Sequence, residues 1–315
     1  GKVAPNVVYL EFERLLLFPW LFDLLNMNNR FLPDSSPNSY GGQFHGFSFI
    51  SPTAPYYIKD NVDDDVESWG GAYSKRYLKF NGVDNWIEVE NKLPVGSEDT
   101  EALDTDTEFS LMCFAKIDKL GRKIFFSTPD HRKQQGTLIW IPSDNTNPAL
   151  KYKPSAGIYF ETLNKTSPTG KMHFIVTRSD QDTLMVSVPY TRTAEVWTRK
   201  WLLVYYYIIN SNHTRFPWSS YGLTYETKDE QSILTAYIDG IQVGQRIKEG
   251  AVRAHKSEYG MILGRMSYET EANGYRYFFG IMDQAGMDDR TFSPSEMLLW
   301  HRGVMKSTLV QYIRD

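Results

Sequence analysis

The sequence predicts an all-β protein, a two-sheet antiparallel jelly-roll sandwich with an N-terminal apolar arm and a short C-terminal helix. Aromatic residues make up 15% of the chain, and together with Val, Ile and Thr they favour strands. Short apolar runs recur between Gly, Pro, Asn and Asp turns, whereas a convincing helical pattern occurs only late in the chain. The expected strands are 77–81, 85–90, 108–117, 123–127, 137–141, 157–162, 172–177, 183–188, 201–209, 233–239, 242–248, 260–265 and 276–287.

Length and composition exclude several classes of protein. The 315 residues allow one large β-domain or two modest ones, and 41% hydrophobic residues supply a core. A net charge of −4 gives no sign of a nucleic-acid-binding surface. Cys113 is the single cysteine, which excludes an internal disulfide and a thiolate metal site. It shares a strand face with Phe109, Leu111 and Ala115, so we expect a buried thiol.

The N-terminal part is expected to be distinct, with an arm and loop region at 1–70 and the jelly-roll domain at 71–315. Its apolar run at 15–25 is too short to span a bilayer, so no membrane span is predicted. The arm either packs back onto its own domain or docks on a partner, because its large apolar side chains are costly to expose. These side chains are Phe18, Trp20, Leu21 and Phe22. Gly1 in place of Met fits a processed product or part of a longer polypeptide.

Three local signals in the sequence predict two hairpin turns and one helix. In Tyr77–Glu90, alternation on both sides of Asn81-Gly82 indicates a β-hairpin. Asp239-Gly240 indicates a second hairpin. Near the C-terminus, Ser293 is expected to be an N-cap, with Pro294 at the first helical position and Gly303 as the stop.

The order of the motifs resembles that of the laminin G-like, concanavalin A-like lectin/glucanase jelly-roll family. The resemblance extends over about 77–303 and implies the same sandwich. The chain departs from the family in lacking a late cysteine pair and in a long segment at 210–231, which we expect to be a loop. The segments that carry the resemblance are Tyr77–Glu90, Glu108–Ile117, Trp197–Tyr207, Tyr237–Gly244, Ile262–Arg265, Phe279–Asp283 and Phe292–Met297.

Candidate binding residues are aromatic, because a sugar site needs an aromatic platform with polar neighbours. The same residues could instead contact a protein, since Tyr and Trp are enriched at protein interfaces. The candidates are Phe216, Trp218 and Tyr221 in the long loop, together with Trp140. The family resemblance also implies a possible calcium site at Asp84 and Asp283, although either carboxylate could serve the backbone instead.

Evidence for catalysis is weak in this sequence. Asp104, Asp106 and Glu108 alternate as in glucan hydrolases of this fold, but they stand at the entry of a strand. The histidines show no metal-ligand spacing, and His173 is expected to be a strand residue with a local hydrogen bond.

Three functions follow, and the first is a non-catalytic structural or adhesion module in a larger assembly. It would contact other protein subunits or glycans, on a virion or an extracellular surface. The alternative is a calcium-assisted, lectin-like carbohydrate-binding module, and a glycoside hydrolase is the third.

Overall fold

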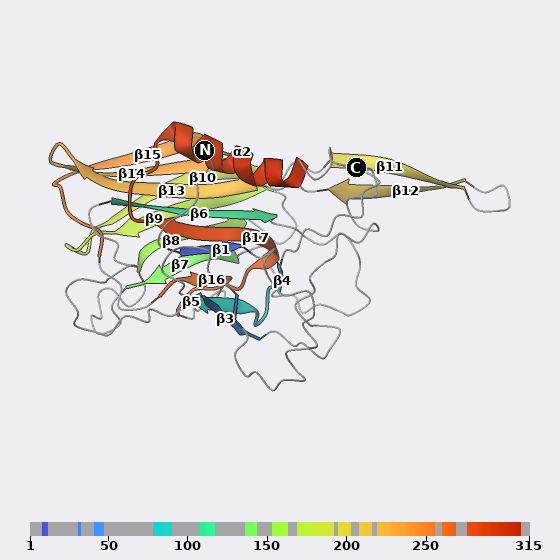
Figure 1. Ribbon diagram of the computed structural model, residues 1–315, viewed down its shortest axis with the longest axis horizontal. Coiled ribbons are helices and arrows are strands. Elements are labelled where there is room, and N and C mark those ends of the chain that lie inside the picture. Colours follow the sequence, from blue (N-terminus) through green and yellow to red (C-terminus); the bar gives the residue numbers. More distant parts are fainter. Residues whose placement is uncertain are drawn as a thin grey trace.

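The protein is described here from a computed structural model. The structure describes residues 8–11, 31–32, 41–46, 78–89, 108–116, 136–143, 153–162, 169–191, 195–202, 208–215, 219–255, 260–268 and 276–309. These residues form two large antiparallel sheets, a separate two-stranded sheet and a helix (Figure 1). The predicted two-sheet sandwich with a C-terminal helix is confirmed, and it is the fold that the concanavalin A-like resemblance implies.

The first sheet has seven strands, and all of its pairs are antiparallel. Its spatial order is β1 (Val8–Glu11), β17 (Phe279–Asp288), β6 (Glu108–Lys116), β13 (Ser219–Lys228), β14 (Gln231–Ile238) and β15 (Ile241–Glu249). The seventh strand, β4 (Leu78–Asn81), pairs with the first residues of β17.

The second sheet has eight strands and is also antiparallel. Its spatial order is β10 (Thr183–Thr191), β9 (Thr169–Thr177), β8 (Pro154–Thr162), β7 (Gly136–Pro142), β16 (Ile262–Leu263), β5 (Trp86–Val89), β3 (Gly42–His45) and β2 (Phe31–Leu32). The third sheet is a ribbon of β11 (Glu195–Leu202) and β12 (Ile208–Arg215).

The core lies between the two large sheets, and strand alternation decides which residues enter it. In β6, Leu111, Cys113 and Ala115 join the main apolar cluster, whereas Met112 and Phe114 belong to a separate cluster on the other side. Burial of Cys113 is confirmed, and it raises the pKa of the thiol well above its usual range.

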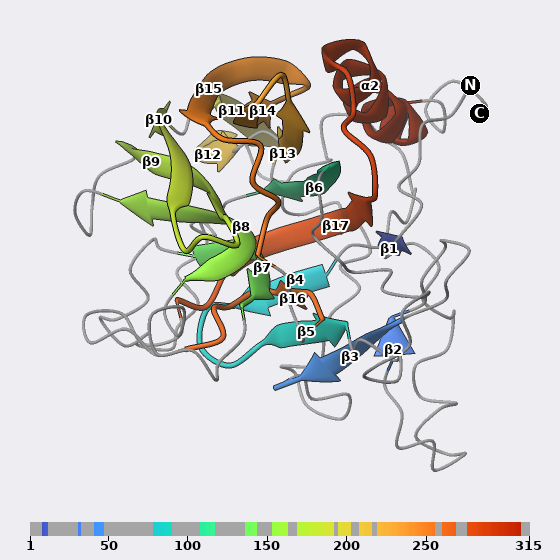
Figure 2. The same cartoon turned by 90° about the vertical axis from the view of Figure 1, so that its left-hand side faces the viewer.

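The helix α2 (Pro294–Leu309) covers part of the outer face of the seven-stranded sheet (Figure 2). Its Met297 and Trp300 pack on Met112, Phe114 and Tyr237. Ser293 and Glu296 form a capping box, because the Glu296 amide donates to Ser293 Oγ at 3.3 Å and the Ser293 amide donates to Glu296 Oε2 at 2.8 Å. The predicted start is confirmed, but the predicted stop at Gly303 is wrong, since the helix continues through it.

One predicted hairpin is confirmed and the other is wrong. Asp239 and Gly240, with φ of +55° and +75°, connect β14 to β15 in the same sheet. Gly82 also has a positive φ of +71°, but β4 pairs with β17 and β5 pairs with β16 and β3. The connection at 82–85 therefore crosses from one sheet to the other, so Tyr77–Glu90 is not a hairpin.

The expected long loop at 210–231 contains a central strand instead. Strand β13 lies between β6 and β14, and its Tyr221, Leu223 and Tyr225 alternate into the core. The single strand expected at 201–209 is replaced by the ends of β11 and β12, with 203–207 outside the described residues. The strand expected at 123–127 also lies outside them.

Parts of the N-terminal region are strands of both large sheets. Strand β1 pairs with β17, and β3 pairs with β5. Val8 is completely buried in the core cluster. These strands were not predicted. Each of the two large sheets therefore includes strands from the region that was expected to be an arm and a loop.

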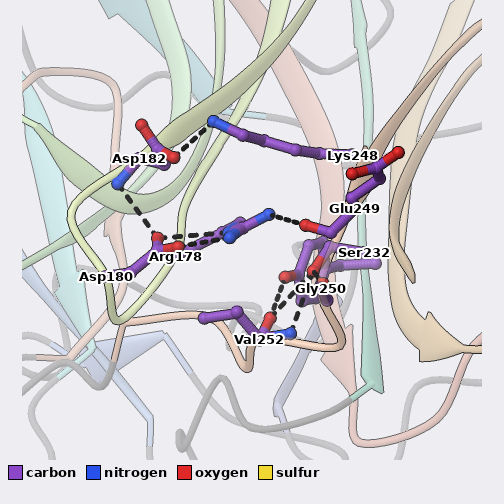
Figure 3. A network of polar contacts seen from close by, with 9 residues as sticks. Arg178, Asp180, Asp182, Ser232, Lys248, Glu249, Gly250 and Val252 are labelled. Atoms are coloured by element: carbon purple, nitrogen blue, oxygen red, sulfur yellow. Dashed lines mark hydrogen bonds and ion pairs between the residues drawn. The ribbon is translucent and has the colours of Figure 1, made fainter. Parts of the chain in front are cut away.

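A polar network joins the two large sheets at the turn between β9 and β10 (Figure 3). The Arg178 guanidinium pairs with Asp180 and donates from Nη1 to the Glu249 carbonyl at 3.0 Å. Lys248 in β15 pairs with Asp182 beside it. Arg178 is 4% exposed, so its hydrogen bond to the Glu249 carbonyl is an internal clamp between the sheets, whereas Asp180 and Asp182 lie at the surface.

Candidate functional site

The outer face of the eight-stranded sheet carries a row of aromatic and charged side chains. Strand alternation separates this row from the core, so that Ile139, Ile158 and Phe174 point inward while their neighbours in sequence lie on the other face. The register places Tyr159 opposite His173 and His173 opposite Ser187. We call this surface the outer-face site; its members are Trp86, Glu88, Trp140, Tyr159, Glu161, His173, Arg265, Tyr268, Arg276 and His45.

Tyr159 lies at the centre of one half of the site. Its ring stacks on His173 with centroids 4.6 Å apart and an interplanar angle of 21°. Trp140 packs with its edge against the same ring at 6.3 Å, and the Arg276 guanidinium lies 5.4 Å from its centroid. The Tyr159 ring is only partly exposed and is fixed by these neighbours, so it offers a rigid apolar platform.

A chain of polar contacts borders this platform. His173 Nδ1 lies 2.8 Å from Ser187 Oγ, and its Nε2 lies 3.2 Å from Glu161 Oε2. Arg276 Nη1 lies 3.7 Å from the other carboxylate oxygen of Glu161. Burial is the main cause that lowers the pKa of His173, so the imidazole is neutral at neutral pH. The predicted local hydrogen bond of His173 is confirmed.

Arg276 is held in an uncommon backbone conformation, with φ of +47°. Its carbonyl accepts a hydrogen bond from the Thr137 amide at 3.1 Å, which ties the segment to β7. A non-glycine residue with positive φ carries a backbone cost that the surrounding structure must offset. Such positions concentrate at functional sites, and this one places a guanidinium beside Tyr159.

Trp86 is the centre of the other half of the site. His45 stacks on it with centroids 3.8 Å apart and an interplanar angle of 9°, and the Arg265 guanidinium lies 3.6 Å from its ring. His45 Nε2 is 3.3 Å from Glu88 Oε2. Each half therefore combines an aromatic ring, an arginine, a histidine and a glutamate. The halves are joined by Ile262, which pairs with Glu88 on one side and with Trp140 on the other.

Gly157 leaves room for the indole ring of Trp140. The register places Trp140 opposite Gly157, and a Cβ at Gly157 would lie 3.0 Å from Trp140 Cε3. The indole Nε1 donates to Ser267 Oγ at 3.1 Å, and Tyr268 packs with its edge against the ring at 5.7 Å. Trp140 is thus a buried support for Tyr159 and Tyr268, which are both partly exposed.

Two predicted aromatic platforms are buried. Trp140 lies in the outer-face site but is only 2% exposed, so its neighbours and not its own ring form the surface. The expectation that Tyr221 is a surface residue is corrected by its position in β13, where it is fully buried in the core. Phe216 and Trp218 lie outside the described residues. So do the arm residues Phe18, Trp20, Leu21 and Phe22.

The expected calcium ligands are not brought together by the described contacts. Asp84 is exposed in the connection between β4 and β5 and accepts a 3.4 Å hydrogen bond from Asn85 Nδ2. Asp283 belongs to β17, and its side chain lies outside the description. Within the described residues no group of three or more His, Cys, Asp or Glu could hold a metal ion. The calcium site stays a prediction.

The candidate catalytic positions are only partly described. Glu108 is exposed at the start of β6, and Asp104 and Asp106 lie outside the described residues. The fold does bring Ser220, His301 and Asp239 together, but Ser220 Oγ and Asp239 Oδ1 approach the same nitrogen, Nδ1, at 2.9 Å and 3.9 Å. A catalytic triad needs the serine and the aspartate on opposite ring nitrogens. This group therefore ties α2 to the sheet and is not a hydrolase triad.

Comparisons with known proteins find similar structures but no related sequence. No family model matches the chain, and no curated protein does. It is similar to a heptameric SAP-like pentraxin from Limulus polyphemus, with 12% identity over 61% of this chain and 69% of that one and a TM-score of 0.34.

Two further solved structures extend the comparison. One is the CBM40 of a Ruminococcus gnavus IT-sialidase, with 9% identity over 70% of this chain and 94% of that one and a TM-score of 0.39. The other is a botulinum neurotoxin type C structure, with 8% identity over 94% of this chain and 51% of that one and a TM-score of 0.48. These low scores carry no argument about what this chain binds.

The described helix is not a membrane span. In the part of the chain that the structure describes, no helix is long and apolar enough to cross a bilayer.

Proposed function

We propose that this protein is a carbohydrate-binding module whose ligand lies across the outer-face site. The observation that carries the proposal is the pairing of partly exposed aromatic rings with charged groups along one sheet. Tyr159 and Trp86 each have an arginine over the ring and a glutamate nearby. A sugar ring presents C–H groups that pack on an aromatic face and hydroxyls that exchange hydrogen bonds with charged side chains.

The rigidity of the site supports this proposal. The strands of one antiparallel sheet carry Trp86, Tyr159 and His173 at fixed register positions. Trp140 packs with its edge against Tyr159, lies close to Gly157 and donates a hydrogen bond to Ser267. A platform that is already ordered loses little side-chain entropy when a ligand binds, which favours affinity for small polar ligands.

The arrangement of the polar groups favours binding over hydrolysis at this site. Glycoside hydrolysis uses two carboxyl groups on either side of the scissile bond. In the described outer-face site, Glu161 is engaged by His173 and Arg276, and Glu88 by His45. Both glutamates therefore already face side chains of the protein, whereas a catalytic carboxyl group must face the scissile bond. We therefore propose recognition without bond cleavage.

Glycan binding by the Tyr159→Ala variant tests the proposal. Wild-type protein is screened on a glycan array, and affinities for the best ligand are then measured by calorimetry. We expect Tyr159→Ala to weaken binding about fivefold, because an aromatic contact contributes about 1 kcal/mol. Tyr159→Phe keeps the ring and should bind nearly as wild type. Ile241→Ala removes an apolar side chain, 64% exposed, from the other sheet and serves as the control.

Two results would overturn the proposal. One is the absence of binding to any glycan by a folded wild-type protein. The other is unchanged affinity in both Tyr159→Ala and Tyr268→Ala, which would place the ligand elsewhere. Circular dichroism of each variant separates loss of binding from loss of the fold.

A further inference from the structure

Among the described residues, Glu161 is the one carboxylate in the half of the outer-face site around Tyr159, which we call the Tyr159 half. His173 Nε2 lies 3.2 Å from its Oε2, and Arg276 Nη1 lies 3.7 Å from its Oε1. The register places Lys171 of β9 directly opposite Glu161 of β8, with the Lys171 side chain exposed on the same face. One negative group is therefore shared among three nitrogen-bearing side chains.

The Tyr159 half carries an excess of positive charge. Arg276 and Lys171 are cations at neutral pH, and Glu161 supplies a single negative charge. These three are the described charged groups that act on His173, so two positive charges stand against one negative charge. The whole chain, by contrast, has a net charge of −4. A local positive excess in an acidic protein is suited to a negatively charged ligand.

The Arg276 guanidinium is only partly neutralised by Glu161. A separation of 3.7 Å is beyond hydrogen-bond distance, and within the described residues neither Nη1 nor Nε of Arg276 has a hydrogen-bond partner. Polar groups inside proteins normally have such partners, and charged donors form the strongest hydrogen bonds. The Arg276 side chain lies beside the Tyr159 ring and is 17% exposed. Its position therefore points to a negatively charged partner on this platform.

The half of the site around Trp86 lacks this excess. Among its members, Arg265 and Glu88 carry one charge of each sign. Its histidine, His45, stacks on Trp86 and lies 3.3 Å from Glu88, as His173 does with Tyr159 and its own glutamate. The two halves thus have the same kinds of side chain and differ in charge, which makes His45 a matched control for His173.

We propose that the outer-face site takes an acidic sugar, whose carboxylate or sulfate group lies beside Arg276 and Lys171 and makes His173 take up a proton. This inference rests on the proposed carbohydrate binding and names the class of glycan. The sugar ring lies on Tyr159, and the acidic group supplies the negative charge that the Tyr159 half lacks. Hydrogen bonds between ionised groups are shorter and stronger than those between neutral groups, so the acidic group contributes much of the affinity.

The contacts of His173 suit a change of protonation. Its Nδ1 lies 2.8 Å from Ser187 Oγ, and its Nε2 lies 3.2 Å from Glu161 Oε2. A neutral imidazole donates from one ring nitrogen, whereas an imidazolium donates from both. A hydroxyl oxygen and a carboxylate oxygen can each accept such a bond. The protonated ring therefore already has an acceptor beside each nitrogen.

A bound acidic group shifts the protonation equilibrium of His173. Burial is the main cause that lowers its pKa; Glu161 acts to raise it, and the two nearby cations act to lower it. A ligand anion beside these groups raises the pKa, because an opposite charge favours the imidazolium. Binding then draws a proton from the solvent, so affinity should rise as the pH falls through the ordinary histidine value, near 6.5. Sugar carboxylates and sulfates stay charged in this range.

A glycan array tests the charge of the ligand. The array carries uronic acid, sialic acid and sulfated glycans, each beside its counterpart without the acidic group, so that carboxylate and sulfate are distinguished. We expect binding to acidic glycans, at least about tenfold weaker binding to the neutral counterparts, and weakening of the acidic binding with salt. Lys171→Gln should weaken binding to the best acidic glycan, whereas Lys228→Gln, at an exposed lysine of the other sheet, should not.

Calorimetry at pH 6.5 tests the role of His173. Titrations in two buffers of different ionisation enthalpy give the number of protons taken up on binding. We expect net uptake by wild type and by His45→Gln, and none by His173→Gln. The affinity of His173→Gln should be close to that of wild type at pH 7.5 and should not rise in acid. Circular dichroism checks the fold of each variant.

Two results would overturn this inference and leave carbohydrate binding in place. One is equal binding of acidic glycans and their neutral counterparts by the wild-type protein. The other is binding of an acidic glycan by wild type without proton uptake, or with an uptake that His173→Gln retains. The wild-type measurements need no variant, so they decide the outcome even if His173→Gln does not fold. If no glycan binds, the proposed function fails and this inference fails with it.

Discussion

The two outer faces of the sandwich carry aromatic residues in opposite settings. On the seven-stranded sheet, Phe114 and Tyr237 are buried beneath Trp300 of α2, in a cluster with Met112, Phe292 and Met297. On the eight-stranded sheet, Trp86 and Tyr159 are partly exposed. The first set has an element of the chain as its cover. The second set has arginines, histidines and glutamates as its neighbours.

This difference shows how the surrounding groups can distinguish an aromatic side chain that stabilises the fold from one that is suited to bind a ligand. Aromatic side chains covered by a helix are stabilised by the burial of their apolar surface. Charged groups beside an aromatic ring would be costly under the same cover, because burying a charge without compensation costs several kcal/mol. A face that combines both is suited to a polar ligand that brings its own hydrogen-bonding groups.

Removal of the Trp300 side chain should have the largest effect on stability, and it should affect only the face that α2 covers. Trp300→Ala leaves a cavity between α2 and the sheet and should lower the free energy of unfolding by about 3–5 kcal/mol. Urea denaturation measures the loss. Leu299→Ala, from a neighbouring side chain that is 51% exposed, should change it by less than about 0.5 kcal/mol. Glycan affinity measured well below the melting temperature should be unchanged, and a matching loss of affinity would contradict the independence of the two faces.

A methyl group added at Gly157 should disturb the outer-face site on the eight-stranded sheet and leave the face under α2 unchanged. Gly157→Ala puts a Cβ 3.0 Å from the Trp140 ring and 3.3 Å from the Ile139 carbonyl, and overpacking of this kind costs about 1–3 kcal/mol. Because Trp140 supports Tyr159, glycan affinity should fall as well. Combining the change with Trp140→Phe should recover part of the stability, which a double-mutant cycle detects. Simple additivity of the two changes would show that the contact is not responsible.

Local signals in the sequence identified the elements that local residues determine. Asp239-Gly240 and the Ser293 cap were predictable because turn and cap chemistry depends on adjacent residues. The hairpin predicted at Asn81-Gly82 was wrong because a turn-forming pair does not determine which sheet the next strand joins. The helix passes Gly303 even though glycine favours an end there.

The candidate site was harder to predict than the fold. Strand β13 could have been recognised, because Tyr221, Leu223 and Tyr225 alternate with small residues. The outer-face site could not, since Tyr159, His173 and Arg276 come from separate strands and from the segment that precedes β17. Their meeting depends on the register between β8 and β9 and on the backbone of Arg276. Of its members only Trp140 was named from the sequence as a binding residue, and it is a buried neighbour of Tyr159.

Acid should weaken both faces together by opening the clamp between the sheets. The hydrogen bond from Arg178 is the main cause that lowers the pKa of Asp180, so Asp180 binds its proton less readily in the folded than in the unfolded state. Its contribution to stability is therefore present above the unfolded pKa, near 4, and is lost as the pH falls through the lower folded pKa. The effect should be the smallest of the three, because the carboxylate is 38% exposed and solvent screens it. Urea denaturation of wild type and Asp180→Asn at a series of pH values measures it, and the gap between the two should close at the acidic end. A gap that stays constant with pH would show that the clamp acts through packing of Arg178 and not through the charge of Asp180.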